Sequence, residues 1–314
     1  MRVMVVGASG AIGTRLVPQL TRRGHEVIGT YTSPGKAGKV RALGAKPIAL
    51  DLLDADAVRR AVFETRPDAV IHQATALANA GFSRSLDKTF AQTNRLRTEG
   101  TDNLLAAARE AGVTRLVTQS FAPYRYMRTG SPVKTEDDPL DPDLPKSARH
   151  TFDAMAHVDE AFLAAGGIVL RYGGFYGAPD PMTKAVRKRQ YPIIGPGTGI
   201  MPFIHLEDAA SATALAVEHD RPAVYNITDD EPAPASEWLP VLARALGAKR
   251  PFRVPVWAGN LIMGAEMVKM SLTCRGASNA RAKKELGWTL RYPSWRQGFP
   301  ASYGPQAEPA KTAA

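Results

Sequence analysis

The first two-thirds of the chain alternate between short apolar runs and longer stretches whose apolar residues repeat with a helical period. Six apolar runs have the length and composition of buried parallel strands: 2–7, 26–31, 46–51, 69–74, 115–120 and 168–173. The stretches between them predict helices near 11–23, 36–43, 54–65, 85–111 and 148–165. This alternation is typical of βαβ units, so it predicts an α/β fold around a doubly wound parallel sheet.

The last third has a different pattern, with prolines and shorter elements. It predicts helices and strands at 206–219, 223–228, 236–247 and 252–255, and an amphipathic stretch at 257–272. We expect residues 1–174 to form the first domain, with further sheet elements at about 200–229. Residues 175–303 should form mainly a smaller α/β substrate-binding lobe with Trp238, Trp257 and Trp288 in its core, and 304–314 a disordered tail.

Composition narrows the function classes. The chain has 314 residues, 44% of them hydrophobic and 22% charged, which is ordinary for a globular protein. Its net charge of +10 comes from scattered basic residues without interleaved aromatics, so we expect no nucleic-acid partner. No targeting signal or run of about 18 apolar residues is visible, which argues against a membrane partner. With a single cysteine, Cys274, a reducing, cytoplasmic location is expected.

A glycine-rich loop follows the first predicted strand. The stretch "VMVVGASGAIGTRL" spaces Gly7, Gly10 and Gly13 three residues apart between a strand and a helix. Gly7 permits a tight turn, Gly10 lets the backbone approach a pyrophosphate, and Gly13 lets the helix pack closely. Amide groups at a helix start bind anions. The loop therefore predicts a Rossmann-type dinucleotide site, with cofactor contacts from Gly7, Ser9, Gly10, Ala11, Ile12 and Gly13.

The ends of the next strands predict the rest of the cofactor site. The second strand ends in "GTYTSPGKAGK", which lacks the acidic residue that would bind the ribose hydroxyls of NAD. Thr32, Ser33 and Lys36 could instead bind a 2′-phosphate, so NADP is preferred over NAD. Further contacts are expected from Asp51 and Leu52 after the third strand and from Ala74 and Thr75 after the fourth.

Several segments together resemble the short-chain dehydrogenase/reductase superfamily, in its atypical or extended branch with the NAD-dependent epimerase/dehydratases. The resemblance covers about residues 1–300, and the order and spacing of the segments carry it. They are "GASGAIG" (7–13), "ALDLLD" (49–54), "DAVIHQAT" (68–75), "LVTQSFAPY" (116–124), "LRYGGFYG" (170–177), "FIHLEDAA" (203–210) and "SNARAKKELGW" (278–288).

The resemblance implies a proton-transfer machinery that this chain lacks in part. The family uses a serine, a tyrosine that moves a proton, and a lysine four residues later that lowers the pKa of the tyrosine. Ser120, four residues before Tyr124, matches the serine. Alignment on Glu160 puts Phe152 at the tyrosine position and Ala156 at the lysine position, and Gly174 replaces an asparagine in the Leu-Arg segment. No metal site is expected.

Other residues could replace the missing pair. Tyr124 follows the fifth strand at the edge where ligands bind in open α/β sheets, so Ser120 and Tyr124 are the catalytic candidates. Four aromatic residues are expected to line the substrate cleft: Tyr126, Phe152, Tyr172 and Phe175. Three other residues are interpreted as structural: His157 in a surface pair with Asp153, His72 in the core and Arg171 before a buried turn.

Three hypotheses follow from these residues. The first is an atypical NAD(P)-dependent oxidoreductase whose small organic substrate, such as an iminium or a conjugated enone, needs no strong proton donor. The second is an isomerase, lyase or hydrolase on the same fold. The third is a dinucleotide-sensing regulatory or binding protein. A homodimer through the two long helices is compatible with all three.

Overall fold

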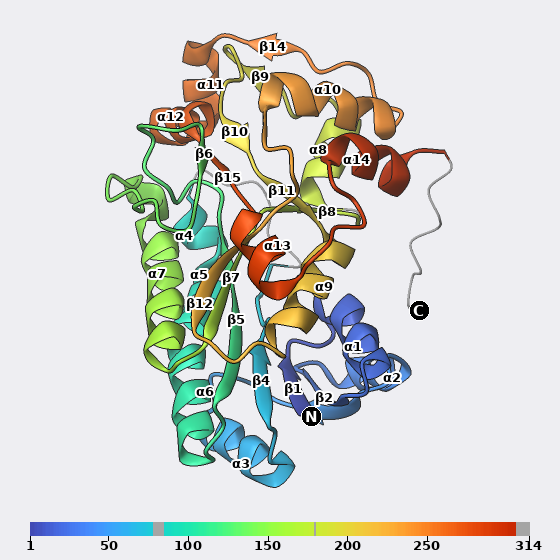
Figure 1. The fold of residues 1–314 in the computed structure, drawn as a ribbon. Coiled ribbons are helices and arrows are strands. Elements are labelled where there is room, and N and C mark those ends of the chain that lie inside the picture. Colours follow the sequence, from blue (N-terminus) through green and yellow to red (C-terminus); the bar gives the residue numbers. More distant parts are fainter. Residues whose placement is uncertain (78–84, 179, 306–314) are drawn as a thin grey trace.

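The protein is built on a seven-stranded parallel sheet (Figure 1). The computed structural model describes residues 1–77, 85–178 and 180–305. Every pair of neighbouring strands in the sheet is parallel. The strands, in spatial order, are β12 (Ala223–Ile227), β7 (Ile168–Tyr172), β5 (Arg115–Phe121), β4 (Ala69–His72), β1 (Arg2–Val6), β2 (Glu26–Tyr31) and β3 (Lys46–Ala49). The predicted doubly wound sheet is confirmed.

Helices cover both faces of this sheet (Figure 1). Because side chains alternate along a strand, Val3 and Val5 enter one apolar cluster while Met4 and Val6 enter the other. The first cluster is shared with α1 (Gly13–Arg22), α2 (Ala37–Ala42) and α9 (Leu206–Ala216). The second is shared with α3 (Ala55–Thr65), α6 (Glu99–Glu110) and α7 (Arg149–Ala164).

The predicted single helix over 85–111 is wrong in one respect, because the structure divides it into three. These are α4 (Leu86–Thr89), α5 (Ala91–Arg97) and α6. The breaks fall at Phe90 and at Thr98, whose ψ of −86° departs from helical geometry. The Thr98 hydroxyl donates to the carbonyl oxygen of Asn94 at 3.1 Å, a local bond that competes with the regular helix.

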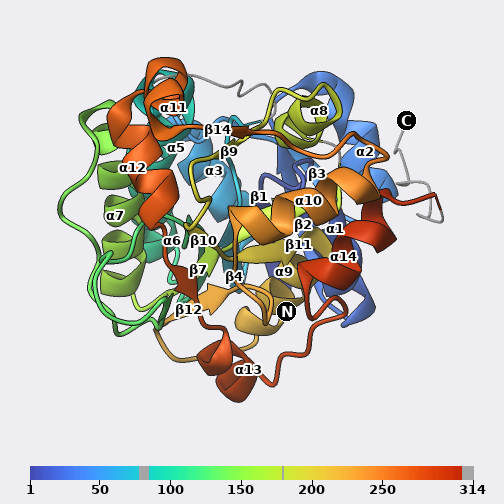
Figure 2. The same cartoon turned by 90° about the horizontal axis from the view of Figure 1, so that it is seen from above.

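Most elements after β7 lie above the carboxyl ends of the strands (Figure 1). In the view from above, α11 and α12 lie on the side of α7, and α10 and α14 on the side of α1 (Figure 2). The strands among them are short: β8 (Gly174–Tyr176), β9 (Ile193–Ile194), β10 (Ile200–Met201), β11 (Phe203–His205), β13 (Ala233–Pro234), β14 (Arg253–Val254) and β15 (Gly276–Ala277), which pairs with β6 (Val133–Lys134). The helices are α8 (Pro181–Arg187), α10 (Ala235–Ala245), α11 (Val256–Met263), α12 (Ala265–Thr273), α13 (Ala280–Leu286) and α14 (Trp295–Tyr303).

Two expectations for this region need correction. The amphipathic stretch is not one helix, because Gly264 with φ of +88° separates α11 from α12. Trp257 is 67% exposed rather than buried, and Trp288 packs with the layer of α9, while Trp238 is buried in an upper cluster with Phe203. Of the predicted tail at 304–314, residues 306–314 lie outside the described residues.

Candidate functional site

The glycine-rich loop joins β1 to α1 in a form that leaves no room for larger residues. Gly7 has φ of +90°, and a Cβ there would lie 2.9 Å from the backbone nitrogen of Ala74 after β4. A Cβ on Gly13 would lie 2.5 Å from the carbonyl oxygens of Gly7 and Ala8. The close approach at Gly13 is therefore to the backbone of the loop itself. The turn can form only with glycine at these positions.

The outer side of the same loop is open. A Cβ on Gly10 would meet only the carbonyl oxygen of Gly7, at 3.2 Å, and Gly10 and Ala11 are exposed. Ser9 is half-buried and Ile12 is buried, and α1 has no acidic residue in its first turn. Free amide groups beside an open backbone attract an anion. The loop therefore fits the pyrophosphate of a dinucleotide.

Thr32, Ser33 and Lys36 lie in the segment after β2, and all three side chains are exposed. Among the described residues, none of their side chains has a hydrogen-bond or ion-pair partner. Asp51 is exposed, and its Oδ1 accepts from the amide of Leu53, while Leu52 is buried. The residues expected to contact a cofactor thus follow β1, β2, β3 and β4 at one edge of the sheet, where Ala74 and Thr75 are half-buried.

Ser120 lies near the carboxyl end of β5 and Tyr124 follows the strand, but their side chains enter different surroundings. The Oγ of Ser120 accepts a hydrogen bond of 2.9 Å from Nη1 of Arg125. Tyr124 has φ of +66° and packs with Phe152, Met155 and other apolar residues. Burial raises the pKa of the Tyr124 phenol well above 10, so this side chain is neutral. Of the two, only Ser120 is joined to a cation.

The four predicted cleft residues do not share one surface. Phe152 is buried in the apolar cluster against which Tyr124 packs. The Tyr126 hydroxyl donates to Oδ1 of Asn226 at 2.7 Å. Tyr172 is buried on the other face of the sheet, bonded to Gln73 and Thr213, with Phe175 against its ring. The burial and bonding of Tyr126 and Tyr172 fit packing better than contact with a substrate, and a cleft role for any of the four stays a prediction.

Helix α7 contains neither tyrosine nor lysine. Glu160, on which the alignment of the helix depends, is exposed, whereas the adjacent Asp159 is buried and paired with Arg171 at 3.0 Å. A register set by Asp159 would shift the two positions from Phe152 and Ala156 to their predecessors on the helix, a threonine and a methionine. Neither register supplies a phenol or an ammonium group.

The histidines and the cysteine are structural in their contacts. His72 is buried, and burial lowers its pKa to about 4. His205 caps α9 by accepting from the amide of Glu207, and burial lowers its pKa to about 3. His157 pairs with Asp102 of α6 at 2.7 Å, not with Asp153 as expected. Burial raises the pKa of Cys274 to about 12, which outweighs the neighbouring Arg275 and makes the thiol inert.

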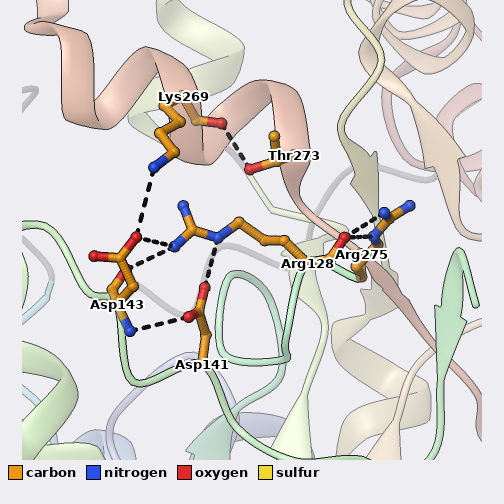
Figure 3. Close-up of polar contacts among 6 residues, drawn as sticks. All are labelled: Arg128, Asp141, Asp143, Lys269, Thr273 and Arg275. Carbon is orange, nitrogen blue, oxygen red and sulfur yellow. Dashed lines mark hydrogen bonds and ion pairs between the residues drawn. The ribbon is translucent and has the colours of Figure 1, made fainter. Parts of the chain in front are cut away.

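A small pocket, with a volume of about 10 Å³ for water-sized molecules, lies beside Tyr124. It has apolar walls from Leu144, Pro145, Met270 and Cys274, while Tyr126, Arg128, Asp141 and Asp143 also line it. Figure 3 shows how Arg128 binds both aspartates and how Lys269 of α12 reaches Asp143. The pocket is thus bounded by the segment that follows β5, by α12 and by Cys274 just after α12.

Sequence reasoning missed Arg97, Arg125, Asp159 and Arg128 as parts of this site. A signal was present for two of them. Arg125 lies between the buried residues Ala122 and Tyr126, and Arg97 is a buried charged residue at the end of α5. Their partners are distant in sequence, so the pattern could not show them. In the described part of the chain, no group of three or more histidines, cysteines or acids could hold a metal ion, and no helix is long and apolar enough to span a membrane.

Comparison with known proteins agrees with this geometry. The model of the NAD dependent epimerase/dehydratase family matches residues 3–228. A curated Streptomyces sp. protein named 3-diazoavenalumate denitrifying reductase is 41% identical over 308 residues, covering 95% of this chain and 99% of its own. Among solved structures, human epimerase family protein SDR39U1 with NADPH has a TM-score of 0.73 at 22% identity, covering 96% of this chain and 99% of its own. Thermus thermophilus UDP-glucose 4-epimerase with NAD has 0.72 at 25%, covering 96% and 98%.

Proposed function

The chain belongs to the NAD-dependent epimerase/dehydratase family, and from that premise we propose that it is an NAD(P)H-dependent reductase of a conjugated electrophile, with aryl diazo compounds as the first candidate class. That it is a nicotinamide-dependent oxidoreductase or epimerase-like enzyme follows from the family and from its reductase relatives. The narrower proposal rests on one observation, the absence of tyrosine and lysine from α7.

Reduction of a simple ketone leaves an alkoxide that must receive a proton, and a positioned general acid contributes typically 10²- to 10⁴-fold to such a step. Release of dinitrogen has no such requirement. When the carbon–nitrogen bond breaks, its electron pair leaves with the neutral dinitrogen molecule. An incoming hydride then forms the carbon–hydrogen bond. A diazonium cation and a hydride thus give an arene and dinitrogen, in balance. A bound nicotinamide supplies that hydride.

The chain's own residues would hold the reactants rather than move protons. The glycine-rich loop binds the pyrophosphate, and the apolar side chains that line the pocket beside Tyr124, which include Leu144, Pro145 and Met270, contact the aromatic ring and exclude water. The named Streptomyces relative, similar along almost its whole length, supports the diazo class because its name describes a diazo substrate and a denitrifying reduction.

The test measures NADPH oxidation with three matched aromatic acids that carry a diazo group, a ketone or an aldehyde. We expect turnover with the diazo acid together with release of one dinitrogen per NADPH, measured by mass spectrometry, and at least a hundredfold lower kcat/KM with the carbonyl compounds. Turnover of the ketone or aldehyde without turnover of the diazo acid would overturn the proposal. So would NADPH oxidation without nitrogen release.

We also propose that the cofactor is NADPH rather than NADH. The support is the cluster of exposed Thr32, Ser33 and Lys36 side chains without an acidic residue after β2. Lys36→Ala should weaken NADPH binding about tenfold and leave NADH binding within about twofold, as measured by fluorescence titration. Lys46→Ala removes the same charge from the amino end of β3 and is the control. Equal losses for the two cofactors would contradict the preference.

A further inference from the structure

The large apolar side chains that the protein exposes are concentrated in one short segment. Of the eight that are exposed in the described part of the chain, five lie within residues 252–262. Trp257 is 67% exposed, whereas the other three tryptophans are at most 4% exposed. Helix α11 packs inward through the buried Gly259, where an added Cβ would lie 2.8 Å from Ile194. Trp257, two residues earlier, is rotated about 200° around the helix and therefore lies on its outer side.

Positive side chains accompany this apolar segment. The stretches 181–206 and 238–265 contain no aspartate or glutamate. Among the described residues, none of their lysines and arginines forms an ion pair. Their positive charges are therefore uncompensated within the described protein, and they create a positive potential that attracts anions. All eight are exposed: Lys184, Arg187, Lys188, Arg189, Arg244, Lys249, Arg250 and Arg253.

The charges and the apolar side chains form one surface, because β14 pairs in parallel with β9 and brings the two stretches side by side. The guanidinium of Arg189 lies 5.7 Å from the centre of the Phe252 ring. An added Cβ on Gly195 would lie 2.7 Å from Cγ2 of Val256. Figure 2 shows β14 between α11 and α8, among the elements above the carboxyl ends of the strands. The upper patch is our name for these residues: Phe252, Val256 and Trp257 with Arg187, Lys188, Arg189, Lys249, Arg250 and Arg253.

We infer that the upper patch binds the surface of a membrane that contains anionic lipids. Lysine and arginine side chains are attracted to anionic headgroups, and tryptophan is enriched where headgroups meet acyl chains. The apolar side chains of the patch enter this boundary while the neighbouring cations stay among the headgroups. The proposed reduction is not a premise of this inference.

The sequence did not predict a membrane partner, because it contains no run that is long enough to span a bilayer. The described structure agrees, since none of its helices is long and apolar enough to cross a membrane. A surface contact needs neither a spanning helix nor a targeting signal, because a short apolar segment flanked by cations is sufficient. Both observations are therefore compatible with the upper patch as a peripheral contact.

Two other occupants fit the upper patch less well. A second copy of the chain in a two-fold dimer would place the same surface against itself, so its six cations would face one another. Such like-charge contacts are strongly unfavourable. A nucleic acid would satisfy the cations and could stack on Trp257. It offers no apolar layer for the aliphatic Val256, whereas acyl chains do.

The test titrates the full-length protein with vesicles of phosphatidylcholine alone and with vesicles of equal parts phosphatidylcholine and phosphatidylglycerol. Because Trp257 is the one exposed tryptophan of the four, its insertion should shift the emission to shorter wavelength. We expect this shift, and sedimentation of the protein with the vesicles, only when phosphatidylglycerol is present. Binding should fall at least about tenfold when the salt concentration is raised to about 0.5 M.

The variants separate the two parts of the patch. Trp257→Ala should weaken sedimentation with anionic vesicles about tenfold, and Trp257→Phe should restore most of it without restoring the emission shift. Lys188→Gln combined with Arg189→Gln should weaken binding about thirtyfold, because each cation near an anionic surface contributes about fivefold. Circular dichroism and thermal unfolding report whether each variant is folded.

The matched control removes two adjacent exposed cations from α3, at the opposite end of the molecule (Figure 1). It combines Arg59→Gln with Arg60→Gln, and Arg59 also lies over an exposed phenylalanine, Phe63, at 4.8 Å from the ring centre. Vesicle binding should change less than about twofold, because the lost charges lie far beyond the screening length from the patch.

Four results would overturn the inference. The first is absence of binding to anionic vesicles, and the second is equal binding to vesicles with and without phosphatidylglycerol. The third is an equal loss of binding in the Lys188/Arg189 and Arg59/Arg60 double variants. The fourth is a different occupant: a dimer that Trp257→Ala dissociates, or salt-sensitive binding to duplex DNA, in either case without binding to vesicles.

Discussion

His72 is an ionisable side chain that the fold holds uncharged at the end of β4. Its folded pKa of about 4 lies below the ordinary value of about 6.5, because burial penalises the cation. As pH falls from 6.5 towards 4, the unfolded chain gains a proton that the folded chain does not, so stability decreases. At pH 5 this amounts to about 2 kcal/mol.

His72→Gln should therefore reduce the loss of unfolding free energy between pH 7.5 and pH 5.0 by about 2 kcal/mol relative to the wild type, as measured by urea denaturation at both pH values. The exposed His150 is the control, and His150→Gln should leave the wild-type difference unchanged. His205 contributes in the same pH window, but it is present in both proteins and cancels in the comparison. An unchanged pH dependence in His72→Gln would contradict this assignment.

Single residues were predictable from sequence where the backbone dictates the residue type. Gly7 and Gly13 fall in this group, because a loop with a positive φ and sub-3 Å approaches excludes any Cβ. Arg97 and Arg125 do not, because their meaning comes from Asp159, which is 34 residues from Arg125 in sequence and on another element. A charged residue within an apolar run signals that something compensates it, but not what.

At the scale of elements, apolar periodicity identified every strand of the main sheet, because buried parallel strands are continuous apolar runs. Apolar periodicity failed at helix interruptions, because the φ and ψ angles of one or two residues decide whether a helix continues. Thr98 and Gly264 break the helices through their backbone angles, which hydrophobicity alone cannot reveal. The register of α7 is a similar case, since Asp159 and Glu160 are both acidic and only burial distinguishes them.

At the scale of the whole molecule, the pocket beside Tyr124 depends on two regions far apart in sequence. The segment after β5 contributes Tyr124 and Leu144, and α12 contributes Met270. Arg128 holds these walls together, because its Nε binds Asp141 at 2.6 Å and its carbonyl oxygen accepts from Arg275 beyond α12 (Figure 3). Both regions therefore contribute walls to the pocket, and neither region lines it alone.

Removal of the Arg128 side chain should weaken both the fold and the cavity. Arg128→Gln leaves the carboxylate of Asp141, which is only 8% exposed, without its cation, and should lower the free energy of unfolding by about 2–3 kcal/mol. It should also raise the KM for the proposed diazo substrate several-fold, because the cavity walls are no longer held in place. Lys269→Gln is the control: its ammonium group lies 3.5 Å from the exposed Asp143, so the unfolding midpoint should not change. Urea denaturation and steady-state kinetics measure both quantities, and equal losses in the two variants would show that Arg128 is no more than a surface charge.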